Sequence, residues 1–301
     1  MLDEAASLLL TLQNPDGGWG AVARRRSNTE VTALAVLALQ SLGKNSGASA
    51  SVEKGMRWLI ERQNADGSWP ISDSAKGPSW ATAIAIITLS SVPEYRPQVV
   101  KAGQWALAQE GGKPGLLAQI VLFVTGQKQV VRLNRDLIGW PWTTGNFSWV
   151  EPTSYFMVAV KKLQAHLPAS AVQQRLEQAE LMIYDRMCDG GGWNSGNAEV
   201  YEEKLWPYPD TTALALIATQ ERRLRKENQL SLGALGDMMK SVDSGLALSW
   251  AIICFSLYQQ DSSWLKKSLE QRFAKTKFLG ETKPLALAIL AMGDGARYFR
   301  I

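Results

Sequence analysis

The chain has 301 residues, of which 46% are hydrophobic and 20% charged, and its formal net charge is +4. This apolar content excludes a disordered chain, and the length is sufficient for a fold that buries most of its surface. With two cysteines and a single histidine, His166, the sequence excludes a disulfide scaffold, a cysteine-rich zinc site and any centre that needs two imidazoles.

Near its N-terminus the chain carries a tryptophan-containing pattern that returns 50 residues later. Residues 9–19 read LLTLQNPDGGW, residues 59–69 read LIERQNADGSW, and residues 189–193 hold a looser copy, DGGGW. A loop and a run of small and aliphatic residues follow each copy, and a further run stands near the C-terminus. These runs occupy residues 32–37, 82–87, 212–217 and 285–290. A period of this length, made of helix, loop and helix, is typical of stacked helical hairpins.

The two helices of each hairpin differ in character. The first is amphipathic, as in residues 53–62 (EKGMRWLIER), whereas the second is apolar nearly all round and must be enclosed by neighbours. Strand signals are absent. We therefore expect an all-α fold, an α/α toroid of six or seven hairpins in one domain over residues 1–301, with an outer amphipathic ring and an inner apolar ring. The outer helices should begin near Asp3, Ser51, Pro97, Ala169, Leu230 and Asp261. The inner helices should begin near Asn28, Pro78, Gly115, Glu151, Asp210, Asp243 and Pro284.

Residues 54–69 follow the pattern KGxxWLxxxQxxxGxW. This pattern resembles the QW motif of squalene–hopene and oxidosqualene cyclases. The resemblance implies the α/α toroid shared by triterpene cyclases, class II diterpene cyclases and protein prenyltransferase β subunits, here as a divergent single-domain bacterial type. A glutamine at the end of an outer helix can bond free main-chain groups, and a tryptophan can cover that junction. We therefore expect a structural role, tying helices together, for Gln13, Trp19, Gln63, Trp69 and Trp193.

The resembled cyclases carry their protonating acid in an Asp-x-Asp-Asp-Thr-Ala motif at the cavity end of an inner helix. When the sequences are aligned on Thr212, the three aspartate positions hold Tyr208, Asp210 and Thr211. The resemblance implies that Asp210, in the place of the donating acid, is the proton donor. The alternative is that Asp210 only caps its helix, where the helix dipole favours a negative charge.

Equivalent positions in other repeats hold Glu30, Trp80 and Glu151, and Asp243 stands near such a position. If the ring closes, these side chains converge on one end of a central cavity. Like charges in a confined site raise one another's pKa. We therefore predict that Glu30 or Glu151 is the partner of Asp210 in general acid catalysis.

Aromatic residues gather just before two of the predicted inner helices. Aromatic walls stabilise carbocations and hold polyisoprenoid surfaces, and they also stack on sugars. The alternative is ordinary packing between helices. The residues expected to contact a ligand are Trp80, Trp140, Trp142, Phe147, Trp149, Tyr155, Trp206, Tyr208 and Asp243.

Two basic runs remain. Arg24, Arg25 and Arg26 lie in the loop before the first inner helix and could clamp a phosphate group beside a helix N-terminus. Residues 222–226 (RRLRK) should lie at the opposite end of the ring. The alternative for both runs is a solvated loop. No metal or other cofactor is predicted, and no motif supports nucleic-acid binding.

Together these patterns predict a toroid that binds a large apolar, isoprenoid-like ligand in a central aromatic and acidic cavity, in one version as a proton-initiated cyclase. The alternatives are a non-catalytic toroid that acts as a ligand sensor or a protein-interaction module, and a glycan-active enzyme with two carboxylates. The N-terminus does not resemble a signal peptide, and the two longest uncharged runs read better as buried helices than as membrane spans. We expect a cytoplasmic protein, with peripheral membrane contact left open.

Overall fold

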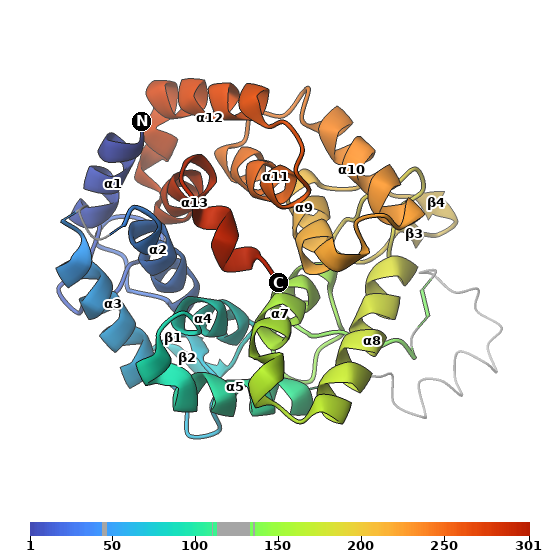
Figure 1. The fold of residues 1–301 in the computed structure, drawn as a ribbon, viewed down its shortest axis with the longest axis horizontal. Coiled ribbons are helices and arrows are strands. Elements are labelled where there is room, and N and C mark those ends of the chain that lie inside the picture. The colour runs from blue at the N-terminus through green and yellow to red at the C-terminus, as the bar shows by residue number, and fades with distance from the viewer. Residues whose placement is uncertain (44–46, 110, 113–132, 135) are drawn as a thin grey trace.

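The computed structural model describes residues 1–43, 47–109, 111–112, 133–134 and 136–301. Within these ranges, twelve α-helices form two concentric rings, which confirms the predicted α/α toroid (Figure 1). The outer ring consists of α1 (Leu2–Thr11), α3 (Ser49–Glu61), α5 (Arg96–Ala108), α8 (Ala169–Asp185), α10 (Lys226–Met238) and α12 (Ser263–Thr276). The inner ring consists of α2 (Thr29–Ser41), α4 (Ala81–Leu89), α7 (Val150–Leu163), α9 (Pro209–Ala218), α11 (Gly245–Leu257) and α13 (Thr282–Met292).

The predicted helix starts agree with the observed ones to within about one turn. The widest difference is at α10, which begins at Lys226 rather than near Leu230. The predicted inner start near Gly115 lies outside the described residues. The described ranges therefore contain six outer and inner pairs.

The two rings are built from two kinds of helix, as their sequences predict. In α4 every residue from Ala81 to Leu89 is buried, because α4 is enclosed by other helices on all sides. In α3, by contrast, the buried residues are only Val52, Gly55, Trp58 and Leu59, which form one stripe. A stripe of this kind packs on the inner ring while the other faces of the helix meet water.

The ring closes between its first and last inner helices. The Thr282 amide donates to the Ala21 carbonyl at 2.9 Å, and the buried Thr282 hydroxyl donates to the Gly20 carbonyl at 2.7 Å. These bonds join the start of α13 to the loop that precedes α2. After α13 the chain turns through η6 (Gly295–Phe299) toward the centre of the ring (Figure 1).

Glutamine and tryptophan side chains bond main-chain groups at the ends of the outer helices. The Gln63 amide donates to the Gly67 and Gln98 carbonyls, both at 2.9 Å, and so links the end of α3 to α5. Gln13 makes the matching bonds to its own loop and to α3. Each repeat tryptophan donates its indole N–H to a carbonyl ten residues earlier, at 2.6–2.8 Å; the donors are Trp19, Trp69 and Trp193.

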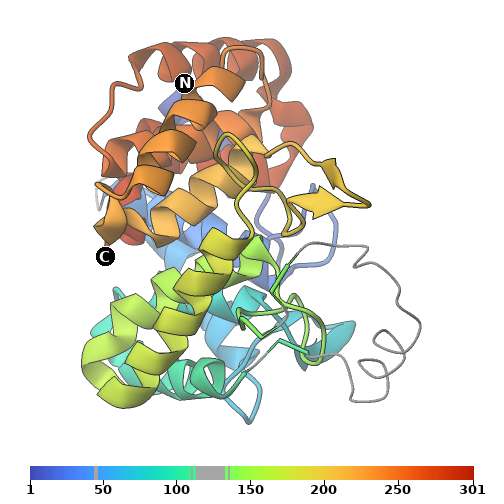
Figure 2. The ribbon, with the colours of Figure 1, turned by 90° about the vertical axis from the view of Figure 1, so that its right-hand side faces the viewer.

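Short elements connect the helices. Two small antiparallel hairpins, β1 (Pro70–Ser72) with β2 (Ala75–Pro78) and β3 (Glu199–Val200) with β4 (Glu203–Lys204), were not predicted, because strands of two to four residues are too short for an alternating pattern. Single 3-10 turns complete the fold at η2 (Pro93–Tyr95), η3 (Gln164–His166), η4 (Gln220–Arg222) and η5 (Lys277–Gly280). Figure 2 shows the hairpins on one side of the ring and the C-terminus on the other. Of the described helices, none has the length and apolar character needed to cross a membrane.

Candidate functional site

The inner helices all begin at the same side of the ring, because each follows an outer helix that runs in the opposite direction. We call this the loop side, and the side where the inner helices end the far side. Four of the inner helices carry a charged residue at their second position: Glu30 on α2, Glu151 on α7, Asp210 on α9 and Lys283 on α13. We call these four residues the charged cluster.

One ion pair and several longer-range electrostatic interactions connect the members of the charged cluster. Lys283 Nζ lies 2.5 Å from Glu30 Oε1, and both side chains are largely buried, 26% and 15% exposed. Glu151 interacts electrostatically with Lys283, Glu30 and Asp210, although these residues come from three other helices. The structure therefore brings together the three acids that the repeat register placed at one end of the ring.

Burial and charge together change the proton affinity of Glu151. Removal from water raises its pKa, Lys283 opposes that shift, and the neighbouring acids Glu30 and Asp210 reinforce it, so that the pKa of Glu151 is about 7. Near neutral pH this carboxyl group is therefore in part protonated. The burial of Lys283 would lower its own pKa, but Glu30 and Glu151 more than compensate and raise it.

Asp210 does not cap its helix in the predicted way. Tyr208 occupies the N-cap position of α9, and Asp210 stands one residue inside the helix, where its carboxylate accepts from the Thr211 amide at 3.0 Å. The carboxylate is only partly buried. Asp210 thus lies in the first turn, with its side chain within the electrostatic reach of Glu151.

One turn deeper, the ring is filled by buried side chains. Each of the six inner helices contributes one residue to this layer. It stands four positions after the residue that matches Glu30 in the repeat register, and every one of the six is 3% exposed or less. These residues are Leu34, Ile84, Tyr155, Leu214, Trp250 and Leu287. Because these six side chains are buried among the described residues, we expect a ligand of the charged cluster to approach from the loop side.

Two of the predicted aromatic residues pack at the level of the charged cluster. Trp80 is the N-cap residue of α4, and its ring lies 5.1 Å from that of Trp142 and 5.3 Å from that of Tyr155. The Tyr155 phenol is buried close to Glu151, and burial together with that negative charge raises the pKa of Tyr155. Tyr155 therefore supports the cluster from below and does not open toward the loop side.

Other predicted aromatic residues lie in the exposed loops of the loop side. Trp206 is 84% exposed, and Phe147 and Tyr208 are also mainly exposed. Trp149 is the N-cap residue of α7 and is partly buried. All four of these residues precede or begin a helix that carries a cluster acid, so the loop side has an aromatic rim.

The prediction that Trp140 contacts a ligand is wrong. It is completely buried, its indole N–H donates to the Ala106 carbonyl at 2.8 Å, and the Arg175 guanidinium lies 3.7 Å from the centre of its ring. These are the contacts of a repeat tryptophan, at the end of outer helix α5. Trp140 is closed off by Arg175 and Phe156, so it has no free face for a ligand.

The prediction that Asp243 contacts a ligand is also wrong. Its side chain is 83% exposed and pairs with Arg272 of α12 at 3.0 Å, so it points toward the outer ring and not toward the charged cluster. The predicted phosphate clamp, Arg24, Arg25 and Arg26, lies in an exposed loop before α2. Arg24 has φ +61°, a left-handed conformation typical of a tight loop.

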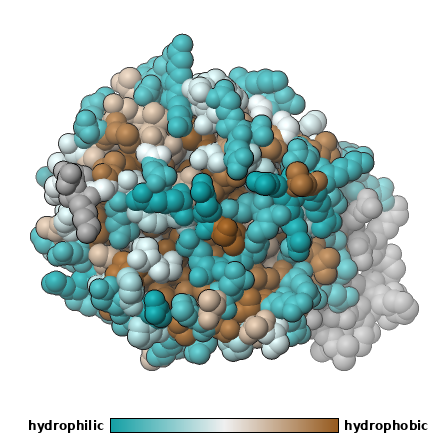
Figure 3. Space-filling view, in the orientation of Figure 1, coloured by the Kyte–Doolittle hydropathy of each residue, from teal (hydrophilic) through white to brown (hydrophobic). Residues whose placement is uncertain are grey.

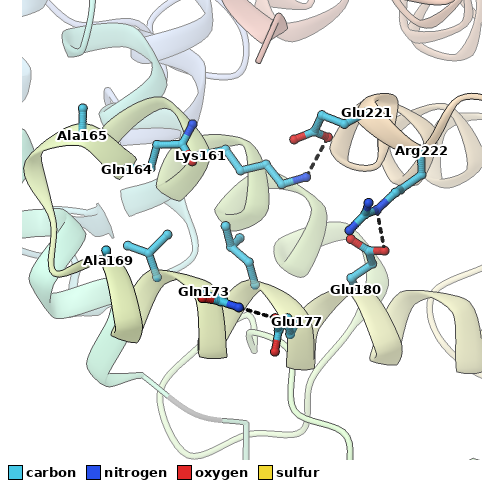
Figure 4. Close-up of a pocket in the computed structure, with 11 residues that line it drawn as sticks. Lys161, Gln164, Ala165, Ala169, Gln173, Glu177, Glu180, Glu221 and Arg222 are labelled. Atoms are coloured by element: carbon cyan, nitrogen blue, oxygen red, sulfur yellow. Dashed lines mark hydrogen bonds and ion pairs between the residues drawn. The ribbon is translucent and has the colours of Figure 1, made fainter.

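The far side carries a pocket of about 480 Å³ between α7, α8 and η4 (Figure 4). Its charged groups are already paired: Lys161 donates to Glu221 at 2.9 Å, and Arg222 to Glu180 at 3.0 Å. Lys161 lies ten residues after Glu151 on α7, roughly 15 Å along the helix. This pocket is therefore separate from the charged cluster. Figure 3 shows that hydrophilic residues cover much of this face of the ring, with smaller hydrophobic areas between them.

Lys283 is the member of the charged cluster that the sequence predictions missed. The run LALAIL at residues 285–290 aligns with TALAVL at 32–37, and this alignment places Lys283 at the position of Glu30. The signal was therefore present in the register. Among the described residues, no group of three or more His, Cys, Asp or Glu side chains could hold a metal ion.

Comparisons with known proteins agree with this architecture. The profile of the squalene-hopene cyclase N-terminal domain matches residues 2–135, while no curated protein matches the chain in sequence. A solved structure of the type II terpene cyclase MstE from Scytonema, in complex with the substrate geranylgeranyl dihydroxybenzoate, is similar with a TM-score of 0.59 and 15% identity over 98% of this chain and 97% of that one.

Two further structures are similar. A novel alpha-amylase from Clostridium perfringens has a TM-score of 0.62 and 9% identity over 97% of both chains. Protein geranylgeranyltransferase-I from Candida albicans, complexed with GGPP, has a TM-score of 0.48 and 12% identity over 68% of this chain, which spans 52% of that one. The two rings and the similarity to the MstE and alpha-amylase structures define the fold as an α/α toroid, and the profile match makes its first part similar to the squalene-hopene cyclase N-terminal domain.

Proposed function

We propose that this toroid binds an amphipathic, isoprenoid-like ligand on the loop side and that Glu151 donates a proton to it. The single observation that carries the proposal is the position of Glu151. Its carboxyl group is in part protonated near neutral pH and lies at the level of the ring where Glu30, Asp210 and Lys283 act on it from three other helices. The match to the squalene-hopene cyclase profile supports an isoprenoid-like ligand.

In this proposal the proton passes from the Glu151 carboxyl group to an alkene carbon or an epoxide oxygen of the ligand. The alkene π electrons form the new C–H bond, or the epoxide C–O bond breaks toward the oxygen, and a carbocation remains. Cyclisation then consumes a second alkene, and the final cation loses a proton to a base. Glu151 is left as a carboxylate, stabilised by Lys283.

The surroundings of the charged cluster assign supporting roles. Trp80 and Trp142 present aromatic surface at the level of Glu151, which suits an apolar chain and a developing positive charge. The exposed aromatic residues Phe147, Trp206 and Tyr208 would hold the remainder of the ligand. Arg24, Arg25 and Arg26 would contact a phosphate headgroup.

A first experiment identifies the ligand. Lipids that co-purify with the protein are extracted and identified by mass spectrometry, and linear isoprenoid alcohols, isoprenoid diphosphates and squalene are then tested for turnover. We expect an isoprenoid-like lipid, and turnover that Glu151→Gln abolishes while binding persists. The matched control is Glu177→Gln in the far-side pocket, which should leave turnover unchanged. Binding without turnover would favour a ligand sensor. If the protein shows no binding and no turnover, the proposal is contradicted.

A glycan-active enzyme is the second candidate, because one observation favours it. A protonated carboxyl group beside other carboxylates is the arrangement that glycosidases use to protonate a leaving oxygen, and the charged cluster is reached from the loop side, where exposed aromatic residues could stack on sugar rings. The structural similarity to an alpha-amylase fits this candidate. Hydrolysis of starch or mannan that is lost in Glu151→Gln would establish it in place of isoprenoid chemistry.

A further inference from the structure

Lys283 is the cation of the charged cluster. Its Nζ lies 2.5 Å from Glu30 Oε1, and its field also reaches Glu151 and Asp210. In the part of the chain that the structure describes, no other lysine or arginine forms an ion pair with these three acids. The partly buried setting strengthens such interactions relative to those at an exposed surface.

Lys283 is held in place by the join that closes the ring. It follows Thr282, whose amide and hydroxyl donate to the loop before α2 at 2.9 and 2.7 Å. These bonds tie the first turn of α13 to the loop that precedes α2. The backbone of Lys283 is therefore anchored beside the loop that leads into α2, and its side chain reaches Glu30 from there.

We infer that Lys283 is the positioning residue of the charged cluster: its ammonium group compensates the Glu30 carboxylate and leaves Glu151 as the group that carries the exchangeable proton. This inference rests on the proposed role of Glu151 and names the residue that governs it. With three acids and one ammonium group, the cluster has a net negative charge of one when Glu151 is protonated. Loss of the ammonium group would leave three carboxyl groups with no cation among them.

The charged groups that act on Glu151 come from three other inner helices, and the two remaining inner helices carry uncharged residues at the same position of the repeat register. The charged ones are Glu30 on α2, Asp210 on α9 and Lys283 on α13, and the buried Tyr155 phenol lies below it on α7 itself. At the same level α4 supplies Trp80 and α11 supplies Leu246, neither of which carries charge. Lys283 is thus the one group in this set that opposes protonation of Glu151.

The test is a pH titration of Glu151 that needs no ligand. Glutamate side chains are labelled with 13C at the carboxyl carbon, and the Glu151 signal is assigned from its loss in Glu151→Gln. In the wild-type protein we expect a midpoint at about 7. In Lys283→Met we expect the midpoint to rise by roughly one unit, because an opposite charge has been removed. In Lys283→Arg, which retains the charge, it should stay near the wild-type value.

Two controls make the result specific. Lys240→Met removes an exposed lysine that pairs with Asp237 of α10 and should leave the midpoint unchanged. Lys283→Gln, which can still donate to Glu30 but has no charge, should behave as Lys283→Met does and replaces it if that variant does not fold. A midpoint that is the same in Lys283→Met and the wild-type protein, or a shift in Lys283→Arg as large as that in Lys283→Met, would overturn the inference.

This outcome is separable from the proposed function. A shifted midpoint together with a failed ligand search would support Lys283 as the positioning residue and count against the isoprenoid-like ligand alone. An unchanged midpoint together with turnover would remove the role of Lys283 and leave the proton donor in place. If a turnover assay is found, the high-pH limb of its pH–rate profile, where Glu151 loses its proton, should move with the midpoint in Lys283→Met and return in Lys283→Arg.

Discussion

Tryptophan residues of this protein serve two different purposes, and burial separates them. Trp140 has no exposed surface and gives its indole N–H to a main-chain carbonyl, whereas Trp206 is 84% exposed and precedes a cluster acid by four residues. A buried carbonyl that loses its donor costs free energy, because no water can replace the bond. The first residue therefore contributes to stability, and the second is available to a ligand.

Trp140→Phe and Trp206→Phe form a matched pair that tests this distinction. Trp140→Phe should lower the free energy of unfolding by about 1–3 kcal/mol, because it removes the indole hydrogen bond to the Ala106 carbonyl, which keeps only the weaker bond from the Gln109 amide, and it leaves space in the core. Trp206→Phe should change the free energy of unfolding by less than about 0.5 kcal/mol. Chemical denaturation measures both. Equal effects of the two substitutions on stability would contradict the assignment of Trp140 to the repeat.

Helices α2 and α3 approach closely at Gly55. A Cβ atom at Gly55 would lie 2.6 Å from Val36 Cγ2 and 2.8 Å from Trp19 Cζ3. Intrinsic helix propensity favours alanine over glycine by about 1 kcal/mol, but overpacking in a core costs about 1–3 kcal/mol. Trp19 is held by its bond to the Leu9 carbonyl and has little freedom to yield.

We therefore expect Gly55→Ala to lower the midpoint of thermal unfolding, in spite of the helix propensity of alanine. Gly233→Ala in α10 is the control, since nothing lies within 4 Å of the Cβ that it would add. That substitution should stabilise the protein by up to about 1 kcal/mol. Stabilisation by both substitutions would show that α2 and α3 are less closely packed than described.

The first turn of α7 carries a group whose protonation should make stability depend on pH. The pKa of Glu151 is about 7 in the folded protein, against an ordinary value of 4.5. Between pH 4.5 and pH 7 the folded chain holds more protons than the unfolded chain. The contribution of Glu151 to the free energy of unfolding is therefore greatest below about pH 4.5 and falls as the pH rises toward 7. Because a pKa difference of one unit corresponds to about 1.36 kcal/mol, the free energy of unfolding falls by about 3 kcal/mol once Glu151 is fully ionised.

Glu151→Gln removes this dependence, because glutamine resembles the protonated acid at every pH. Relative to the variant, the wild-type protein should lose about 2 to 3 kcal/mol of unfolding free energy between about pH 5 and about pH 8. Urea denaturation at several pH values measures the difference. Parallel curves for the two proteins would mean that Glu151 is solvated and has its ordinary proton affinity.

The register of the repeats was enough to predict much of the ring and part of the site. Two helix types with a common period define the toroid, and one register position brought Glu30, Glu151 and Asp210 together. Trp140 was assigned wrongly because 34 residues separate it from the carbonyl that it bonds, compared with ten in the other repeats, so the periodic signal is lost. The prediction that Asp243 contacts a ligand was wrong because its side chain pairs with Arg272, which belongs to a different hairpin.

At the scale of the whole molecule, the charged cluster exists only because the ring closes. Its members come from the first, third, fourth and last of the described inner helices, and the pair between Lys283 and Glu30 spans the join between α13 and α2. One turn deeper the ring is filled with buried side chains. The molecule is therefore expected to act at one side of its ring, with the packed interior holding the acids in place.

The most direct test of this account is whether Glu151 senses acids from distant parts of the chain. The pH midpoint of the Glu151 carboxyl group is compared between the wild-type protein and the variants Asp210→Asn, Glu30→Gln and Asp243→Asn. We predict that the midpoint falls in the first two, because each removes a neighbouring negative charge, and is unchanged in Asp243→Asn, whose acid points to the outer ring. A midpoint that is the same in all four proteins would show that the acids do not meet.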